Sequence, residues 1–247
     1  MPQVYPVIHI HEAAQTVEQA GVAFEAGADG VYLIDHGLSP SEQGIFAIFD
    51  QFEAVKAAHP DRFVGINILG VKGVAQALRI LRAVQEMGYM TDLPDGLWVD
   101  DAVGEITPEV VDYLREIRTI RNEWPASERI KILGGVAFKY TPTYSEDPEF
   151  TGWLTSLVSE YVDVVTTSGA GTGQAAPVDK VRAMSAVARE QGKPIAIASG
   201  VDIENMPLYA DLVDEVLVAT SIETEPYSGV FDRDRLNDLI QIAHRQQ

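Results

Sequence analysis

Three segments in the last third of the chain end in glycines and small hydroxyl residues, which are residue types that can bind a phosphate group. Residues 162–168 lead into Gly169-Ala170-Gly171-Thr172-Gly173, residues 195–198 into Ser199-Gly200, and residues 216–219 into Thr220-Ser221. If each segment is a buried parallel strand that ends in a turn before a helix, its last backbone N–H groups point outward and can hold a phosphate. The alternative is that the glycines only allow tight turns. We expect the ligand to be a small phosphorylated metabolite, bound by Ser168, Gly169, Gly171, Thr172, Gly173, Ser199, Gly200, Thr220 and Ser221.

A second group of side chains can move protons or carry charge. They stand near the ends of five earlier apolar segments, and we predict them to be catalytic: His9, Asp35, Asn67, Asp100 and Lys139. Lys139 could neutralise negative charge on a substrate or, with a pKa lowered by burial, attack a carbonyl as a Schiff-base amine. Asp35 or Asp100 could act as general base or acid, and Asn67 could orient the substrate. Each residue taken alone could instead cap a helix or lie in a solvated loop.

His9, Asp35 and Asp100 are also of the types that hold a divalent metal ion. No compact local motif joins them, so the sequence leaves a metal open and demands no cofactor. His36 directly follows Asp35, so we expect it to be a loop residue that points away from the site; contact with the ligand is the alternative.

Apolar runs rich in Val, Ile and aromatic residues alternate with amphipathic segments along the chain. The runs predict strands at about residues 4–10, 30–35, 63–69, 97–100, 130–138, 162–166, 194–198 and 215–219. Apolar spacings of three and four predict helices at residues 13–26, 44–58, 74–87, 109–122, 150–161, 177–191 and 233–245, with a shorter connection at 205–211. This order is typical of a (β/α)8 TIM barrel, which we expect to form a single domain over residues 1–247. The alternative, a doubly wound open sheet, usually has a glycine-rich turn after its first strand, and none is present here.

Side chains along a barrel strand alternate between the interior and the surrounding helices. We therefore predict five sets of interior residues: Val7, His9 and His11; Val31, Leu33 and Asp35; Gly65, Asn67 and Leu69; Trp98 and Asp100; Gly135, Ala137 and Lys139. The five candidate catalytic residues would then meet at the carboxyl ends of consecutive strands, where barrel enzymes have their active sites. An inward lysine needs a partner, because an unpaired buried ammonium is costly. If Lys139 has a purely structural role, its partner would be Asp100 on the neighbouring strand; the alternative is that it faces an anionic ligand.

The amino-acid composition limits the binding partners and the cellular location that we expect for this protein. Hydrophobic residues make up 46% of the 247 residues, as in an ordinary globular enzyme, and the net charge of −19 repels nucleic acid and anionic membranes. The absence of cysteine excludes disulfides and thiolate chemistry. The first residues do not resemble a signal peptide, and no segment reaches the roughly 20 apolar residues that cross a bilayer. A cytoplasmic protein without membrane insertion is expected, and a homo-oligomer is compatible with this composition.

Several short motifs resemble the BtpA family from about residue 63 to the end of the chain. They are Val64-Gly65-Ile66-Asn67-Ile68-Leu69, Phe138-Lys139, residues 167–173, Ala198-Ser199-Gly200-Val201 and Val218-Ala219-Thr220-Ser221. The resemblance implies a barrel of the ribulose-phosphate-binding kind, with phosphate at the glycine loops and Lys139 as the lysine of the fifth strand. The family is tied to photosystem I biogenesis, and the resemblance brings no defined reaction with it.

The first two strand–loop segments depart from the family pattern. His9-Ile10-His11-Glu12 replaces a segment with a proline- and glycine-rich loop, and Ile34-Asp35-His36-Gly37 replaces an acidic-Asn signature. Tyr140 follows the lysine where the family usually has histidine. The leading hypothesis is an isomerase, an aldolase or other lyase, or a transferase that acts on a phosphate ester. The alternative is a non-catalytic barrel that binds such a ligand or serves as an assembly factor.

Overall fold

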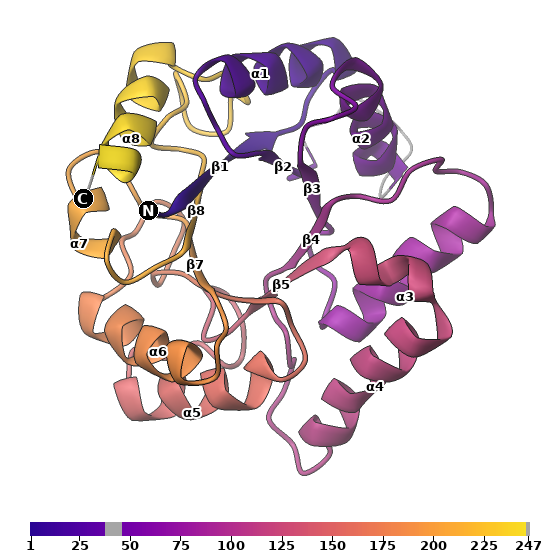
Figure 1. Ribbon diagram of the computed structural model, residues 1–247, viewed down its shortest axis with the longest axis vertical. Coiled ribbons are helices and arrows are strands. Elements are labelled where there is room, and N and C mark those ends of the chain that lie inside the picture. Colours follow the sequence, from indigo (N-terminus) through magenta and orange to yellow (C-terminus); the bar gives the residue numbers. More distant parts are fainter. Residues whose placement is uncertain (38–45, 246–247) are drawn as a thin grey trace.

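Eight parallel strands form one closed barrel in the computed structural model, which describes residues 1–37 and 46–245. Each strand pairs with the next along the chain, and the last pairs with the first (Figure 1). The strands are β1 (Gln3–His9), β2 (Val31–Ile34), β3 (Val64–Asn67), β4 (Gly96–Val99), β5 (Lys131–Gly135), β6 (Val164–Thr167), β7 (Ile195–Ala198) and β8 (Glu215–Val218). The predicted (β/α)8 barrel is therefore confirmed.

Helices surround the barrel as an outer ring (Figure 1). They are α1 (Ala13–Glu25), α2 (Phe46–Ala58), α3 (Val74–Glu86), α4 (Val110–Glu123), α5 (Pro148–Ser159), α6 (Val178–Glu190), α7 (Met206–Tyr209) and α8 (Arg233–Arg245), with a 3-10 turn at Pro125–Arg129. They pack mainly in sequential pairs, α1 with α2, α3 with α4, α5 with α6 and α7 with α8. The first two residues of the helix predicted at 44–58 lie outside the described part of the chain.

The strands are apolar on both faces because one face meets the helices and the other fills the barrel. Ile8, Leu33 and Ile66 belong to the large outer cluster between strands and helices. A separate inner cluster fills the barrel with side chains from most of the strands and from the segment after β5: Tyr5, Val7, Tyr32, Ile34, Trp98, Leu133, Phe138, Val164, Ala196, Ala198 and Leu217.

Large aromatic rings occupy the centre of the barrel where glycines make room for them. The Tyr32 ring packs edge-on against Tyr5 and Trp98, with centroids 5.6 and 6.3 Å apart. A Cβ atom on Gly65 would overlap the Tyr32 ring, and one on Gly96 would overlap its hydroxyl group. The interior is thus packed with side chains and is not a channel.

An ion pair lies inside the barrel at the amino-terminal end of the strands. Lys131 Nζ donates to Glu215 Oε1 and to the Tyr5 hydroxyl, both at 2.9 Å, and lies 4.5 Å from the Tyr5 ring centroid. Burial raises the pKa of Glu215, and the Lys131 charge opposes that shift. With this end filled, a ligand can reach the barrel only at the carboxyl end of the strands.

Two strand predictions need correction. Tyr32 and Ile34 belong to the inner cluster and Val31 and Leu33 to the outer one, so the predicted interior face of β2 is wrong. The fifth strand ends at Gly135 and not near residue 138. Ala137, with φ of 48°, then has left-handed backbone and belongs to the outer cluster, whereas Phe138 points inward.

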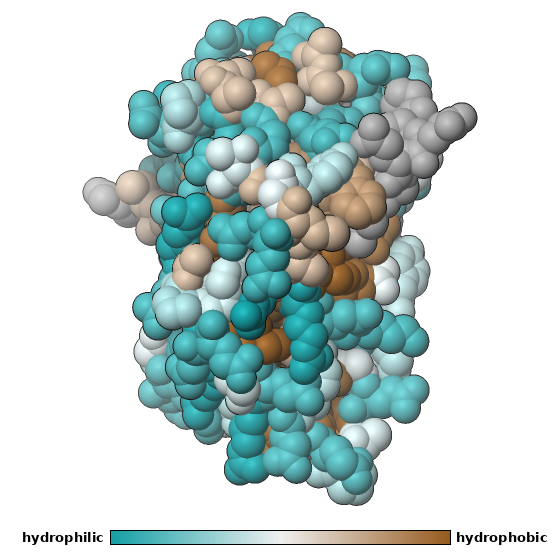
Figure 2. Space-filling view, turned by 90° about the vertical axis from the view of Figure 1, so that its right-hand side faces the viewer, coloured by the Kyte–Doolittle hydropathy of each residue, from teal (hydrophilic) through white to brown (hydrophobic). Residues whose placement is uncertain are grey.

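Hydrophilic side chains predominate among the described residues on the side of the molecule that carries α2, α3 and α4 (Figure 2). Among the described residues, no helix is both long and apolar enough to cross a membrane.

The close packing of Gly65 against Tyr32 generates a stability prediction. Gly65→Ala should lower the free energy of unfolding by about 1–3 kcal/mol, because the added methyl group displaces a buried ring. Gly152→Ala is the matched control, since this helix position has only Val187 Cγ2 at 3.5 Å and should gain up to about 1 kcal/mol. Urea unfolding measures both, and a Gly65→Ala protein as stable as the wild type would contradict the packing argument.

Candidate active site

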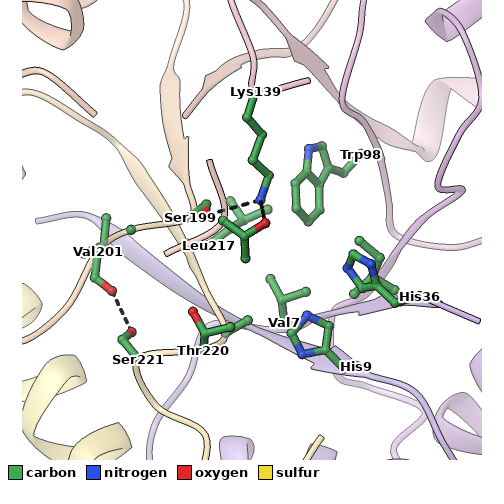
Figure 3. A pocket seen from close by; sticks show the side chains of 14 residues that line it. Val7, His9, His36, Trp98, Lys139, Ser199, Val201, Leu217, Thr220 and Ser221 are labelled. Atoms are coloured by element: carbon green, nitrogen blue, oxygen red, sulfur yellow. Dashed lines mark hydrogen bonds between the residues drawn. The ribbon is translucent and has the colours of Figure 1, made fainter. Parts of the chain in front are cut away.

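A pocket opens at the carboxyl end of the strands and encloses about 450 Å³ of empty space, part of it continuous with solvent. Its walls come from β1, β2, β4 and β8 and from the loops after β2, β5, β6, β7 and β8 (Figure 3). The lining residues are Val7, His9, Ile34, His36, Trp98, Lys139, Thr172, Ser199, Gly200, Val201, Leu217, Ala219, Thr220 and Ser221. Apolar side chains therefore share this pocket with hydroxyl groups, two imidazoles and one ammonium group.

Lys139 extends from the loop after β5 toward the loops after β6 and β7. Its Nζ donates to Thr172 Oγ1 and to Ser199 Oγ, both at 3.2 Å (Figure 3). No ion pair joins Lys139 to a carboxylate within the described residues, so the pairing with Asp100 that a purely structural role would require is not formed. Burial lowers the pKa of Lys139, an effect that the charges of Asp100 and Tyr140 oppose.

Asn67 and Asp100 contact each other beside the pocket and are not among its lining residues. Asn67 Nδ2 donates to Asp100 Oδ1 at 2.9 Å, while Asn67 Oδ1 is buried without a partner in the described structure. Burial raises the pKa of Asp100, and the Asn67 hydrogen bond and the Lys139 charge oppose the rise. The Asp100 carboxyl group can therefore affect the electrostatic potential in the pocket without lining it.

Asp35 does not take part in the pocket, contrary to the prediction from strand parity. Its carboxylate accepts a hydrogen bond from Gly37 N at 2.7 Å, which closes a local turn after β2. Side chains alternate between the two faces, and Ile34 faces the interior. The next side chain that faces the pocket is therefore that of His36, two residues later. The prediction that His36 points away from the site is therefore wrong.

The predicted phosphate-binding residues divide into two groups. Thr172, Ser199, Gly200, Thr220 and Ser221 line the pocket. The other four, Ser168, Gly169, Gly171 and Gly173, do not line it. Ser168 Oγ accepts a hydrogen bond from Lys139 N, and a Cβ on Gly169 would overlap the Gln174 carbonyl.

Some of the groups expected to meet a phosphate already have partners. Thr172 N donates to the Tyr140 hydroxyl, and Gly173 N donates to Ser199 Oγ, both at 3.2 Å. Ser221 Oγ donates to the Val201 carbonyl at 2.6 Å. Binding of an anion by these amides would require the loop to exchange its present contacts for the ligand.

His9 forms the most buried polar contact of the pocket. Its Nδ1 lies 2.7 Å from Glu223 Oε1, and the two side chains are 5% and 0% exposed. Glu223 also accepts backbone hydrogen bonds, from Gly229 N to Oε1 at 3.0 Å and from Tyr227 N to Oε2 at 2.8 Å. Glu223 lies in the segment after β8, where no periodicity or motif marks it, so the only sign of it in the sequence is the need of an inward His9 for a partner.

Aromatic rings enclose the imidazole of His9. The His36 and Tyr227 rings lie with their centroids 5.0 and 4.9 Å from that of His9. Burial lowers the pKa of His36 to about 4, and the charges of His9 and Lys139 act in the same direction. His36 is therefore neutral at pH 7.

A buried lysine fixes the two loops on which Lys139 and Thr172 stand. Lys180 of α6 is fully buried, and its Nζ donates to the Ala137 carbonyl at 2.6 Å and to the Ser168 carbonyl at 2.9 Å. Burial lowers its pKa to about 8. Sequence reasoning misses this role, because position 180 looks like the polar side of an amphipathic helix.

Backbone strain is concentrated around the pocket. Four non-glycine residues of the described chain have positive φ: Ala137, Tyr140, Ser199 and Tyr227. All four lie after β5, β7 or β8, near the carboxyl end of the barrel. Left-handed backbone costs energy in such residues and is concentrated at functional sites in proteins.

The candidate metal ligands His9, Asp35 and Asp100 are not brought together. In the described residues, no three or more His, Asp or Glu side chains form a group that could hold one ion.

Comparison with known proteins finds one matching sequence family and several solved structures with a similar fold. The model of the BtpA family matches residues 12–245, which extends the resemblance well before residue 63. No curated protein matches the chain in sequence.

Solved barrel structures resemble the chain along almost its whole length. Phosphoribosyl anthranilate isomerase from Thermotoga maritima has a TM-score of 0.64 and 16% identity, with 98% of each chain covered. Thiamine phosphate pyrophosphorylase from Pyrococcus furiosus has a TM-score of 0.59 and 12% identity, covering 98% of this chain and 95% of that one. Mycobacterium tuberculosis tryptophan synthase has a TM-score of 0.58 and 16% identity, with coverage of 100% and 93%. At these identities the likeness shows the fold alone.

The position of His36 generates a pH prediction. Its ring should titrate with a midpoint of about 4 in NMR spectra, and Lys139→Met should raise that midpoint by removing a nearby positive charge. Because an unfolded histidine has a pKa near 6.5, the unfolded chain gains this proton first as the pH falls. His36 should therefore reduce stability progressively from about pH 6.5 down to about pH 4.

His36→Gln supplies the control for that stability effect. Relative to the wild type, the variant should gain in free energy of unfolding as the pH falls through this range, because glutamine does not titrate. A His36 midpoint near 6.5, or parallel pH profiles of the two proteins, would contradict the prediction.

Proposed function

The chain belongs to the BtpA family, and we propose that it is a barrel enzyme that acts on a small phosphorylated metabolite. In this proposal the loops after β6, β7 and β8 bind the phosphate, and the reacting part of the substrate lies toward β1 and β2. The observation that carries the proposal is the direction of Lys139, whose ammonium contacts hydroxyl groups of two of these loops inside an open pocket.

The residues around Lys139 suit a phosphate group. Thr172, Ser199 and Thr220 supply hydroxyl groups that donate without a change of charge, and Gly200 lines the pocket beside them. The protein carries a net charge of −19, so an anionic ligand needs a local positive charge. Lys139 provides that charge.

The similar solved structures support a phosphorylated ligand. Their names include phosphoribosyl anthranilate isomerase and thiamine phosphate pyrophosphorylase, and one such isomerase was crystallised with a reduced deoxyribulose phosphate compound. Barrels of this kind often bind phosphate with the loops after the seventh and eighth strands. The same loops carry Ser199, Gly200, Thr220 and Ser221 in this chain.

The opposite side of the pocket suits proton transfer. His9 and His36 come from β1 and from the loop after β2, across from the hydroxyl groups (Figure 3). An open pocket with a lysine that is not neutralised by Asp100 favours an enzyme over a purely structural barrel. The reaction class is isomerase, lyase or transferase chemistry on a phosphate ester that also carries a carbonyl group.

Thermal unfolding in the presence of phosphate compounds tests the proposal. Inorganic phosphate, sugar phosphates, nucleotides and prenyl phosphates are compared, and at least one phosphate ester should raise Tm. A ligand at a hundred times its Kd adds about 2.7 kcal/mol to the free energy of unfolding. If none of these compounds changes Tm, the proposal is wrong.

Substitution of Lys139 tests where the phosphate binds. Lys139→Met should weaken binding of the active compound by roughly 10- to 100-fold, because a charge-assisted hydrogen bond contributes about 1.5–3 kcal/mol. Lys72→Met is the matched control, since Lys72 is an exposed lysine of the loop after β3 and outside the pocket. Isothermal titration calorimetry measures both, and equal losses in the two variants would place the anion elsewhere.

A further inference from the structure

The contact between His9 and Glu223 is more elaborate than a simple ion pair. Glu223 is fully buried and receives three hydrogen bonds, from His9 Nδ1, Gly229 N and Tyr227 N. Both carboxylate oxygens are therefore occupied, and the carboxylate cannot rotate without losing a buried hydrogen bond. A buried carboxylate held in this way is a fixed acceptor for the histidine ring.

A fixed acceptor determines the tautomer of the histidine. A carboxylate can only accept, so the proton between the two groups belongs to His9 Nδ1, and Nε2 has its lone pair free. In the described residues Nε2 has no hydrogen-bond partner, and His9 lines the pocket. The His36 and Tyr227 rings, at 5.0 and 4.9 Å, restrict rotation of the imidazole.

We propose that His9 is the catalytic residue that removes and returns a proton of the bound substrate, and that Glu223 is its positioning residue. The inference rests on the proposed function, because it requires a phosphate ester in the pocket. It also narrows that function to the isomerisation of a phosphorylated hydroxy-aldehyde or hydroxy-ketone.

The proton transfer is balanced within the substrate. His9 Nε2 takes the proton from the carbon next to the carbonyl group, the electron pair of the C–H bond forms a C=C bond, and the carbonyl π electrons move to oxygen. The hydroxyl group on the carbon that lost its hydrogen passes its proton to the enolate oxygen and becomes the new carbonyl group, while the imidazolium returns its proton to the former carbonyl carbon. The reaction therefore consumes no oxidant, reductant or second substrate.

Tautomer measurement tests the role of Glu223 without any substrate. In ¹⁵N-labelled protein, long-range ¹H–¹⁵N spectra at a pH where the ring is neutral should show His9 with the proton on Nδ1, and His9→Asn identifies its signals. Glu223→Gln should populate the Nε2–H form as well. Glu225→Gln is the matched control, because it makes the same change at an exposed position of the same segment. A wild-type His9 with its proton on Nε2 would overturn the proposal.

Deuterium exchange tests the proton transfer itself. The wild-type protein is incubated in D₂O with dihydroxyacetone phosphate and a series of pentose phosphates, and ¹H NMR follows exchange at the carbon next to the carbonyl group. We expect exchange with at least one compound, a loss of about 100- to 10,000-fold in His9→Asn, and a loss of about 10-fold or more in Glu223→Gln. Glu225→Gln should exchange at the wild-type rate.

The two proposals fail in different ways. If a phosphate ester raises Tm but the wild type exchanges no proton of any compound in the series, His9 is not the proton-transfer residue and the proposed phosphate site stands. Unchanged exchange in His9→Asn would exclude His9 from proton transfer in the same way. A lower kcat in Glu223→Gln with unchanged phosphate affinity supports the positioning role, whereas a loss of affinity alone would assign the contact a structural role.

Discussion

The interior of an eight-stranded barrel has room for side chains and little else, and this limit decides where the protein can bind a ligand. Tyr32 and Trp98 fill the middle of the barrel, and this filling is compatible with the backbone only because Gly65 has no side chain. The ion pair of Lys131 and Glu215 occupies the amino-terminal end. The pocket at the other end is thus a consequence of packing, and the loops around it are free to determine the chemistry.

The loops after β5 and β6 are held in place by a buried lysine that does not line the pocket. The ammonium of Lys180 holds the carbonyls that precede Phe138 and Gly169, so the loops after β5 and β6 keep a constant separation. Burying an ammonium group is costly unless hydrogen bonds satisfy it, and two strong acceptors reduce that cost here. The left-handed conformations of Ala137 and Ser199 add further strain to the same region. Helix α6 therefore stabilises the barrel and also fixes the positions of two loops that surround the pocket.

The sequence predicts the barrel well because eight apolar runs and the helices between them are strong periodic signals. It does not predict which side chains of β2 face the barrel interior. Hydrophobicity does not distinguish the two faces of this strand, because all four of its residues are buried: Val31, Tyr32, Leu33 and Ile34. The sequence predicts that Lys139 reaches the pocket as an inward residue of the fifth strand. That strand ends at Gly135, and the left-handed backbone at Ala137 changes the direction of the side chains that follow, so Lys139 reaches the pocket from a loop. Glu223 could not be predicted, because its contact with His9 depends on barrel closure and not on any local pattern.

The contact between His9 and Glu223 joins residues that are 214 positions apart, one in the first strand and the other beyond the last. A ribosome must therefore synthesise all eight strands and the segment after β8 before these two side chains can meet. The loops predicted to bind phosphate, from Lys139 to Ser221, emerge earlier. A nascent or truncated chain that lacks the final segment could still present those loops but would have no partner for His9. Synthesis of the segment after β8 and assembly of the pocket are thus coupled events.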